Sequence, residues 1–325
     1  MKSIIKYHSV KYPNMTTQDY TKLLYQSFFG PGHFIKDIAF VNEYYYKELQ
    51  NIQDSFDKNL YEHIGNNFVR VNMSVYSKYF DNNSLIKSFF ESSKLNLDQD
   101  ILLDKFKESL TLIPNDGFLD SYNFSNVHHS LIYNNLYHPH YRVIKENFLS
   151  IDMKVLQLQN YINNNTGFIF ALEGKCASGK TTLSNRLDNV TIIDVDDFFL
   201  RKELKTKERL EEIGGNIDYD LYEECLKKLK PNSTISYTIF DCQTQQYTSK
   251  QIQIKDKVLV VGVYSYHPKV RKYIDNLLYL LVDENVQLER LKERSMFERF
   301  INEWVPLENR YFDSFDFIGN ADILI

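Results

Sequence analysis

The segment from Phe168 to Leu183 is the part of this sequence that most constrains its fold. Its apolar run Phe168-Ile-Phe-Ala-Leu is followed by Glu-Gly174-Lys-Cys-Ala-Ser-Gly179-Lys180-Thr181-Thr182. In the pattern G-x-x-x-x-G-K-[ST], the glycines let successive backbone N–H groups turn inward around a phosphate, the lysine adds a positive charge, and the hydroxyl can bind Mg²⁺. The segment therefore predicts a strand, a phosphate-binding loop and a helix, with a nucleotide held by Gly174, Ala177, Ser178, Gly179, Lys180, Thr181 and Thr182.

The composition of the chain limits which partners it can bind and in which cellular compartment it is expected. The 325 residues carry a formal net charge of -5, whereas a dedicated nucleic-acid binder normally shows a basic patch, so we predict no nucleic-acid partner. The three cysteines, Cys176, Cys225 and Cys242, form no C-x-x-C pair, which favours a reducing compartment over a disulfide framework. No apolar run approaches the length of a membrane span, so we expect a cytoplasmic protein without a membrane partner, while oligomer formation stays open.

The chain is long enough for two domains, and its pattern changes near residues 150 to 165. Before this point, Thr16-Thr-Gln-Asp19 has the form of a capping box at a helix start, and residues 98–110 repeat apolar side chains at helical spacing. We therefore expect a mainly α-helical N-terminal domain of unknown role at residues 1–150, a linker helix at 151–165 and a phosphate-loop domain at 166–325.

Strand-like and helical segments alternate after the phosphate loop. Apolar or β-branched runs occur at residues 190–194, 235–240, 258–262 and 277–282, and a short one closes the chain at 321–325. Fully apolar runs are typical of parallel strands that are covered on both faces, and strands that alternate with helices imply right-handed crossovers. The predicted fold class of this half is therefore α/β, a doubly wound parallel sheet with ligands at the carboxyl ends of its strands.

Three aspartates lie at the end of the predicted strand 190–194 or directly after it: Asp194, Asp196 and Asp197. If Leu172 ends the first strand, they leave the same sheet edge as the phosphate loop. Phosphoryl transfer needs a carboxylate that orients the attacking hydroxyl and accepts its proton, and an aspartate at a strand end can do this. The alternative is that these acids are solvated or cap a helix, but their position after a phosphate loop favours a functional role.

Three motifs together resemble the uridine kinase and phosphoribulokinase family of P-loop kinases: the phosphate loop, Val195-Asp-Asp-Phe-Phe199 and Val261-Gly-Val-Tyr-Ser-Tyr-His-Pro268. The resemblance covers about residues 166–325. It implies the P-loop NTPase fold, ATP and Mg²⁺ as cofactors, and a small-molecule acceptor as partner. The catalytic residues that it implies are Lys180, Asp196, Arg290 and Arg294.

The resemblance also implies binding roles for individual residues. Asp196 would contact the acceptor hydroxyl, and the other acceptor-binding residues would be Asp241, Tyr264 and His267; Thr181 and Asp194 would bind the metal. Residues 288–299 are similar to the arginine-bearing lid helix of the family, which adds Arg299 to the ATP-binding residues. Arginines at this spacing can share a helix face and clamp a triphosphate, although a solvated charged helix is the alternative.

The sequence departs from the family pattern in two places. The family has Glu-Gly at the end of the strand before the His-Pro segment, where this chain has Val261-Gly262. The expected metal-proximal acid is therefore absent there, and Asp194 or Glu173 are candidates to replace it. In the lid, Ser295 follows Arg294 in place of an aspartate. Both departures weaken the assignment to uridine kinase itself more than they weaken the assignment to a kinase.

The N-terminal half matches none of those kinases. Its notable segments are Gly30-Pro-Gly-His33 and Tyr137-His-Pro-His-Tyr-Arg142. Histidines in this half could be metal ligands, but without cysteines or a fixed acid partner we favour polar side chains packed against an aromatic core. Since Arg142 could contact a phosphate or carboxylate, we hypothesise that His33 and Arg142 contact the acceptor or its product.

The function predicted from the sequence is an ATP- and Mg²⁺-dependent kinase that phosphorylates a hydroxyl of a small metabolite, with a nucleoside such as uridine favoured. The same loop, base and lid would serve pantothenate, nicotinamide riboside or a sugar. A regulatory nucleotide-binding NTPase, in which the N-terminal domain contacts a partner, is the alternative from another class.

Overall fold

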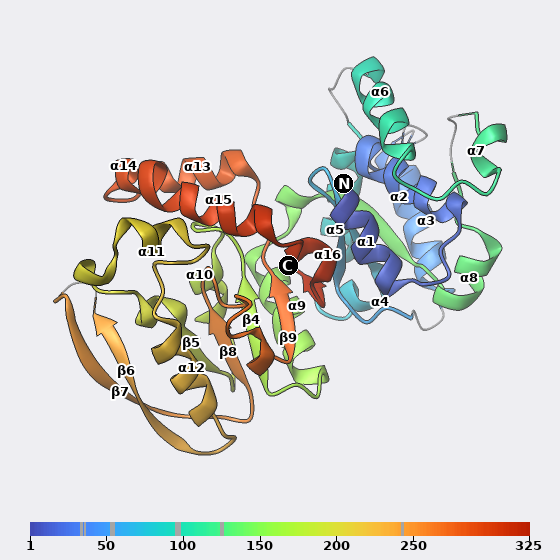
Figure 1. Ribbon diagram of the computed structural model, residues 1–325. Helices are drawn as coiled ribbons and strands as arrows, with labels where there is room; N and C mark the ends of the chain where they lie inside the picture. The colour runs from blue at the N-terminus through green and yellow to red at the C-terminus, as the bar shows by residue number, and fades with distance from the viewer. Residues whose placement is uncertain (33–34, 36, 53–55, 95–98, 124–126, 242–243) are drawn as a thin grey trace. The chain divides into compact units, whose positions relative to one another are not determined.

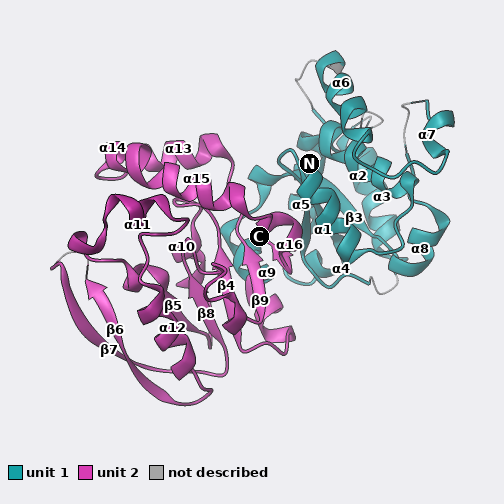
Figure 2. Ribbon diagram, in the orientation of Figure 1, with its two compact units in different colours: residues 1–157 teal, residues 158–325 magenta. Residues whose placement is uncertain are grey.

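The computed structural model describes residues 1–32, 35, 37–52, 56–94, 99–123, 127–241 and 244–325 (Figure 1). The chain forms two compact units, residues 1–157 and residues 158–325 (Figure 2). The division falls within α9 (Ile151–Asn164). Among the described residues, no helix combines the length and the apolar character that a membrane crossing requires.

Unit 1, residues 1–157, is rich in helices, as the sequence predicts. The capping box at the start of α2 is present, because Thr16 and Asp19 bond each other's backbone and side-chain groups. The helix ends before Gly30, whose φ of 60° an L side chain rarely adopts. The helices before α9 are α1 (Lys2–Lys11), α2 (Thr17–Phe29), α3 (Ile38–Leu49), α4 (Met73–Tyr76), α5 (Asn82–Ser92), α6 (Gln99–Leu110), α7 (Phe118–Ser121) and α8 (Leu131–Tyr137), with the 3-10 turn η1 (Glu146–Phe148).

Unit 1 also contains a three-stranded antiparallel sheet that the sequence analysis does not anticipate. Its strands lie in the order β1 (Tyr61–Gly65), β2 (Phe68–Asn72) and β3 (Tyr141–Lys145). The turn between β1 and β2 contains Asn66 and Asn67, both with positive φ, and asparagine tolerates this conformation better than most residues. The core on one side of the sheet is formed by Tyr61, Val69, Val71 and Ile144 with residues of α3, α5 and α9.

Unit 2, residues 158–325, is built on a five-stranded sheet in the order β10-β9-β4-β8-β5. All neighbouring pairs are parallel, which confirms the predicted fold class. Leu172 on β4 and Asp194 on β5 both pair with Val261 on β8, so the three strands end at the same level. The strands are β4 (Ile169–Glu173), β5 (Thr191–Asp194), β8 (Val258–Val261), β9 (Asn276–Tyr279) and β10 (Ile323–Leu324).

Helices and one separate hairpin complete unit 2 (Figure 1). Strands β6 (Thr234–Asp241) and β7 (Gln246–Gln253) form a two-stranded antiparallel sheet of their own. The helices after α9 are α10 (Lys180–Ser184), α11 (Lys207–Glu211), α12 (Tyr219–Lys228), α13 (Glu284–Lys292), α14 (Phe297–Arg299), α15 (Val305–Ser314) and α16 (Phe317–Asn320). Short 3-10 turns lie at η2 (Val195–Phe198), η3 (Lys202–Leu204) and η4 (Arg271–Tyr273), and a π-helical stretch lies at η5 (Phe300–Trp304).

The segment that resembles a lid helix is broken in the structure. Helix α13 ends at Lys292, and Met296 has a φ of 68° before α14 begins at Phe297. This left-handed residue interrupts the helix, so Arg299 is not on the helix that carries Arg290. The expectation that the arginines share one continuous helix face is therefore wrong.

Candidate active site

The loop between β4 and α10 has the backbone conformation that the phosphate-loop pattern predicts. Gly174 has a φ of 151° and Gly179 a φ of 106°, and a Cβ on Gly174 would lie 2.6 Å from the Leu280 carbonyl oxygen. Only glycine fits this turn. Helix α10 begins directly after the loop, and the first N–H groups of a helix have no partner within it. The Ser178 hydroxyl is buried and has no hydrogen-bond partner among the described residues. The loop therefore has the donors that a phosphate group needs.

Lys180 lies inside this loop. Its Nζ atom donates hydrogen bonds to the carbonyl oxygens of Gly174 (2.6 Å) and Lys175 (2.9 Å). Burial lowers the pKa of Lys180, while neighbouring carboxylates, including those of Glu308 and Glu173, oppose this shift. Thr181 and Thr182 are exposed in the first turn of α10. The positive charge and the hydroxyl that the motif requires are thus adjacent at the start of the helix.

Side chains from α13 and α15 contact the backbone of the loop. Arg290 Nη1 donates to the carbonyl oxygens of Ala177 and Ser178, at 3.0 Å each. Gln287 of α13 donates to the Cys176 carbonyl oxygen. From α15, the Glu308 carboxylate accepts a hydrogen bond from the Cys176 N–H at 2.8 Å, and Glu308 is only 7% exposed. Glu308 therefore takes up a backbone donor of the phosphate loop.

Sequence reasoning does not identify Glu308 or Gln287. Nothing in the local pattern around Glu308 distinguishes it from a solvated acid on a helix. It lies 132 positions from Cys176, so only the packing of α15 brings the two together. Burial raises the pKa of Glu308, and the positive charge of Lys180 opposes this rise.

The three aspartates after β5 have different environments. Asp194 accepts a hydrogen bond from the Asp196 N–H at 3.0 Å and so caps the turn η2. Asp197 is bound by the β6-β7 hairpin, because its Oδ2 atom accepts from Tyr237 Oη and from Lys250 Nζ, both at 2.9 Å. The Asp196 carboxylate is exposed. Asp197 thus anchors the hairpin, whereas Asp196 is accessible.

Asp196 also has a shifted titration. Desolvation by surrounding protein atoms and the nearby Asp194 charge raise its pKa to about 7, while Lys180 opposes this rise. A carboxylate with a raised pKa, close enough to sense the charge of the phosphate-loop lysine, is suited to accept a proton near neutral pH.

Glu173, a candidate for the missing family acid, is completely buried at the end of β4. Its carboxylate accepts hydrogen bonds from the Gly174 and Tyr266 N–H groups, from Ser265 Oγ and from Tyr311 Oη. Burial raises its pKa to about 7. These bonds tie the phosphate loop to the segment after β8 and to α15, which makes Glu173 a positioning residue. Among the described residues, no group of three or more His, Cys, Asp or Glu side chains could hold a metal.

The residues assigned to the acceptor lie in two places. Tyr264, with a φ of 73°, and His267 are buried in the segment after β8, and His267 stacks on Tyr219 at 4.3 Å between ring centres. The buried hydroxyls of Tyr264 and Tyr219 have no partner among the described residues. Burial lowers the pKa of His267 to about 4, so the ring is neutral. Asp241 instead ends β6 in the hairpin.

The remaining assigned residues are not brought to the phosphate loop by any described contact. The Arg294 guanidinium lies 5.4 Å from the Phe300 ring centre, and Arg299 pairs with Glu303 at 2.8 Å. In unit 1, Arg142 pairs with Glu48 at 2.7 Å. His33 lies outside the described residues. Of the three arginines assigned to ATP, only Arg290 contacts the loop.

Comparison with known proteins supports the kinase resemblance for this half of the chain. The phosphoribulokinase / uridine kinase family matches residues 201–301. Uridine-cytidine kinase B from Dictyostelium discoideum is 24% identical over 160 residues, which cover 45% of this chain and 66% of that protein. Uridine kinase from Borrelia duttonii (strain Ly) is 27% identical over 144 residues, which cover 40% of this chain and 68% of that protein.

This chain thus spans about two thirds of the length of these curated relatives. A solved structure described as a possible uridine kinase from Bacillus stearothermophilus covers 54% of this chain and 96% of its own, with 21% identity and a TM-score of 0.43. On the family match, the two curated relatives and the phosphate loop, the C-terminal half of this chain is similar to the P-loop kinases of the phosphoribulokinase and uridine kinase family.

Proposed function

We propose that this chain is an ATP-dependent kinase that transfers the γ-phosphoryl group to a hydroxyl of a nucleoside such as uridine. The observation that carries the proposal is that β4 and β5 end at the same level of one parallel sheet, so that the loop with Lys180 and the exposed Asp196 leave the same edge. A phosphate-binding cation beside an accessible carboxylate is the pair that phosphoryl transfer to a hydroxyl requires. The names of the curated relatives favour a nucleoside over other acceptors.

The residues of the loop fit a triphosphate and its metal. The N–H groups at the start of α10, Lys180 and Arg290 would hold the phosphates, and Thr181 with Asp194 would hold Mg²⁺. ATP supplies the transferable phosphoryl group. Lys180 has a third N–H group, beside the two that donate to carbonyl oxygens of the loop, for a phosphate oxygen, and Glu308 would compete with a phosphate for the Cys176 N–H. Asp196 would orient the acceptor hydroxyl and accept its proton.

The acceptor would be held by groups that have no protein partner in this structure. The Tyr219 and Tyr264 hydroxyls are buried and unpaired among the described residues, although buried polar groups are normally hydrogen-bonded. A Cβ at Gly214 would lie 2.2 Å from Tyr219 Oη, so a larger residue at this position would cover that hydroxyl. We assign these two hydroxyls to recognition of the hydroxyl and carbonyl groups of the acceptor. The neutral His267 ring, whose nitrogens bond the Ile213 carbonyl oxygen and the Lys269 N–H, would support Tyr219 by stacking on it.

The test of the proposed function is ATP-dependent release of ADP, measured with nucleosides, pantothenate, nicotinamide riboside and sugars as acceptors. We expect uridine or another nucleoside to raise ADP release well above the rate with ATP alone. A rise with pantothenate or a sugar only would contradict the nucleoside assignment. ADP release that no acceptor changes would instead favour a regulatory NTPase.

A separate prediction concerns Glu308. In Glu308→Gln, a negative charge is removed beside the loop that receives phosphate, so the ATP Kd should fall about 3- to 10-fold, as expected when a like-charge interaction of about 1 kcal/mol is removed. Isothermal titration with a non-hydrolysable ATP analogue measures this. The matched control is Glu303→Gln, because Glu303 pairs with the exposed Arg299 and not with the loop. Weaker ATP binding with a greater need for Mg²⁺ would identify Glu308 as a metal ligand and contradict this prediction.

A further inference from the structure

One face of the sheet of unit 1 combines an apolar cluster, which includes Ile64, Phe68 and Val143, with the buried polar residue Arg70. Side chains alternate along a strand, so Arg70 of β2 lies on the face opposite to Val69 and Val71. Its cross-strand neighbour on β1 is Glu62. Arg70 is only 2% exposed. Burying a guanidinium costs stability unless its N–H groups are paired, so the partners of Arg70 matter.

The guanidinium of Arg70 is only partly bonded. Its Nε atom donates to Gln26 Oε1 at 2.9 Å, and its plane lies over the Tyr141 ring at 4.7 Å. The atoms Nη1 and Nη2 are buried and have no hydrogen-bond partner among the described residues. Arginine presents two parallel N–H groups that match a carboxylate or a phosphate. The unpaired end of Arg70 therefore has the geometry of an oxyanion receptor.

The acids nearest to Arg70 are bound by other groups. Glu62 forms an ion pair with Lys11 and accepts a hydrogen bond from Tyr12 Oη at 2.7 Å. Asp57 also pairs with Lys11, at 2.9 Å. Burial raises the pKa of Glu62, but the Lys11 charge outweighs this effect and lowers the pKa to about 2. Glu62 therefore stays ionised and paired with Lys11. Neither acid lies within ion-pairing distance of Arg70 in the described structure.

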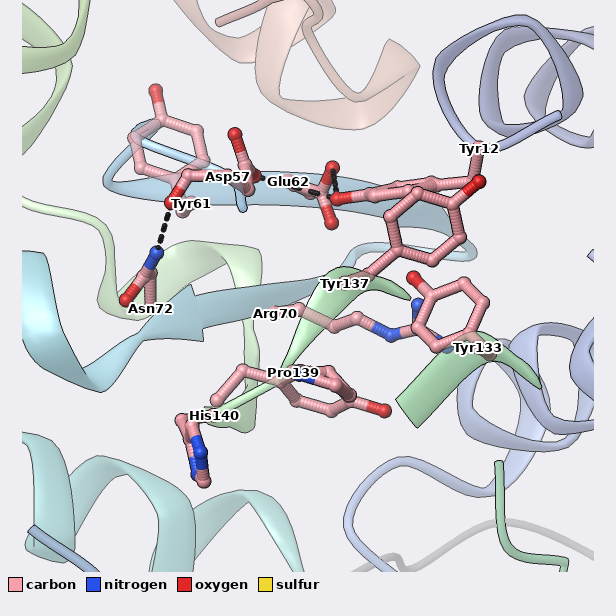
Figure 3. A pocket seen from close by; sticks show the side chains of 11 residues that line it. Tyr12, Asp57, Tyr61, Glu62, Arg70, Asn72, Tyr133, Tyr137, Pro139 and His140 are labelled. Carbon is pink, nitrogen blue, oxygen red and sulfur yellow. Dashed lines mark hydrogen bonds between the residues drawn. The ribbon is translucent and has the colours of Figure 1, made fainter. Parts of the chain in front are cut away.

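Arg70 extends into a small cavity lined by aromatic rings. Figure 3 shows its side chain running from β2 toward Tyr133, below Tyr137 and away from Asp57. The cavity has a volume of about 30 Å³, and Tyr12, Tyr133, Tyr137 and Tyr141 contribute to its wall. Since one water needs about 10 to 15 Å³ on this measure, there is room for one anionic group but not for a whole metabolite.

A second and larger cavity adjoins the first. It has a volume of about 320 Å³ and shares Pro139 and Tyr141 with the small cavity. Its wall includes Gln26, the partner of Arg70, and three basic residues, Lys22, His128 and Arg142. This volume is in the range of small-molecule sites. An anionic group at Arg70 would thus have space beside it for the rest of a small molecule.

Two basic side chains, Arg70 and Lys22, lie close to His129 in the wall of the larger cavity. Burial and the charges of Arg70 and Lys22 lower the pKa of His129 to about 3, although the Asp19 carboxylate opposes this. Asp19 itself is fully engaged, because it accepts hydrogen bonds from His129, Thr16 and Ser130. Glu48, the acid in the wall of the larger cavity, pairs with Arg142 and His140. Lys22 has no ion pair with a described residue.

We propose that unit 1 contains a second ligand site, in which Arg70 Nη1 and Nη2 bind the carboxylate or phosphate of a small metabolite whose body occupies the larger cavity beside Lys22. Tyr141, which lines both cavities, suits a ligand with an aromatic or sugar ring next to its anionic group. The site is formed by residues of unit 1 alone and does not depend on the function proposed for unit 2.

The experiment measures binding to the full chain in the Lys180→Ala background, so that the phosphate loop contributes little to the signal. The probes are inorganic phosphate, uridine monophosphate and 4-hydroxybenzoate, which distinguish a phosphate from a carboxylate ligand. We expect at least one of them to raise the melting temperature and to give a saturable calorimetric titration. If none of the three binds, the proposal is wrong.

Two variants locate the bound probe. Arg70→Lys keeps the charge but loses the paired N–H groups, so the Kd should rise about tenfold or more. Lys22→Ala should raise the Kd about threefold, while Lys87→Ala, an exposed position on α5 outside both cavities, should leave it unchanged. If Arg70→Lys does not fold, Lys22→Ala decides the matter. Binding that Lys22→Ala and Lys87→Ala affect equally would overturn the assignment.

Discussion

In Lys180→Ala, the turnover of phosphoryl transfer should fall about 10²- to 10³-fold or more, the loss typical of removing one preorganised charge from a site of developing negative charge. Lys180 is the buried cation of the loop, and its Nζ atom is held by carbonyl oxygens of the loop itself. A phosphate entering the loop offers this ammonium group a stronger, charged acceptor than those carbonyls. The measurement is kcat together with the affinity for ATP.

The matched control is Lys175→Ala in the same loop. Lys175 pairs with Glu284 at 3.5 Å, and its side chain is partly exposed. Its removal should change kcat by less than about threefold, because exposed ion pairs contribute little. Equal losses in the two variants would mean that the loop needs positive charge in general. Near-normal turnover in Lys180→Ala would remove the basis for the assigned phosphate site.

The second large effect is expected in Asp196→Asn. The variant should bind ATP normally but turn over about 10²- to 10⁴-fold more slowly, which is the contribution typical of a positioned general base. Asp197→Asn is the matched control, because the same change at the next residue removes the negative charge that binds Tyr237 and Lys250 and leaves Asp196 in place. Asp197→Asn should loosen the β6-β7 hairpin, and it should reduce kcat less than Asp196→Asn does. A larger loss at Asp197 would show that the wrong carboxylate was chosen.

The pH profile gives an independent check on Asp196. As a base, it acts in the ionised form, and its raised pKa of about 7 keeps part of it protonated at neutral pH. Turnover of the wild type should therefore rise with pH through about 7 and level off above it. Asp196→Asn should lose this rise. A wild-type turnover that is constant between pH 6 and pH 8 would speak against Asp196 as the base.

The phosphate loop and the parallel sheet could be predicted because their signals are local. Gly174 and Gly179 occupy positions where the backbone has positive φ, so the sequence pattern reflects a conformational requirement. Strands β4, β8 and β9 are buried within a parallel sheet, and their continuous apolar runs show this directly. Each of these features can be recognised without knowing what packs against it.

The sheet of unit 1 is hidden in the sequence because β1 and β2 are buried on both faces while they carry polar residues. Glu62, Arg70 and Asn72 lie within strands, yet they are buried, so the usual alternation of apolar and polar residues is hidden. The remaining signal is the pair Asn66-Asn67 between two short runs that contain β-branched and aromatic residues, which favours a tight hairpin. The polarity that obscured the strands is the feature that points to a ligand.

The contacts around the phosphate loop could not be predicted for a different reason. Glu308 and Gln287 come from helices that follow the last long strands, and their roles depend on where those helices pack. The roles of Arg290 and Arg299 also depend on the three-dimensional course of their helices. A spacing that suits one helix face predicted a joint role, but the left-handed conformation at Met296 separates Arg299 from Arg290.

The most direct test of the central claim is the transfer of label from ATP that carries a radioactive γ-phosphate. The full chain is incubated with this ATP, Mg²⁺ and uridine, and the products are separated, with Lys180→Ala as the control. The account predicts that label appears in a uridine monophosphate with wild-type protein and is nearly absent with Lys180→Ala. Label that appears only as inorganic phosphate, whatever nucleoside is present, would contradict it.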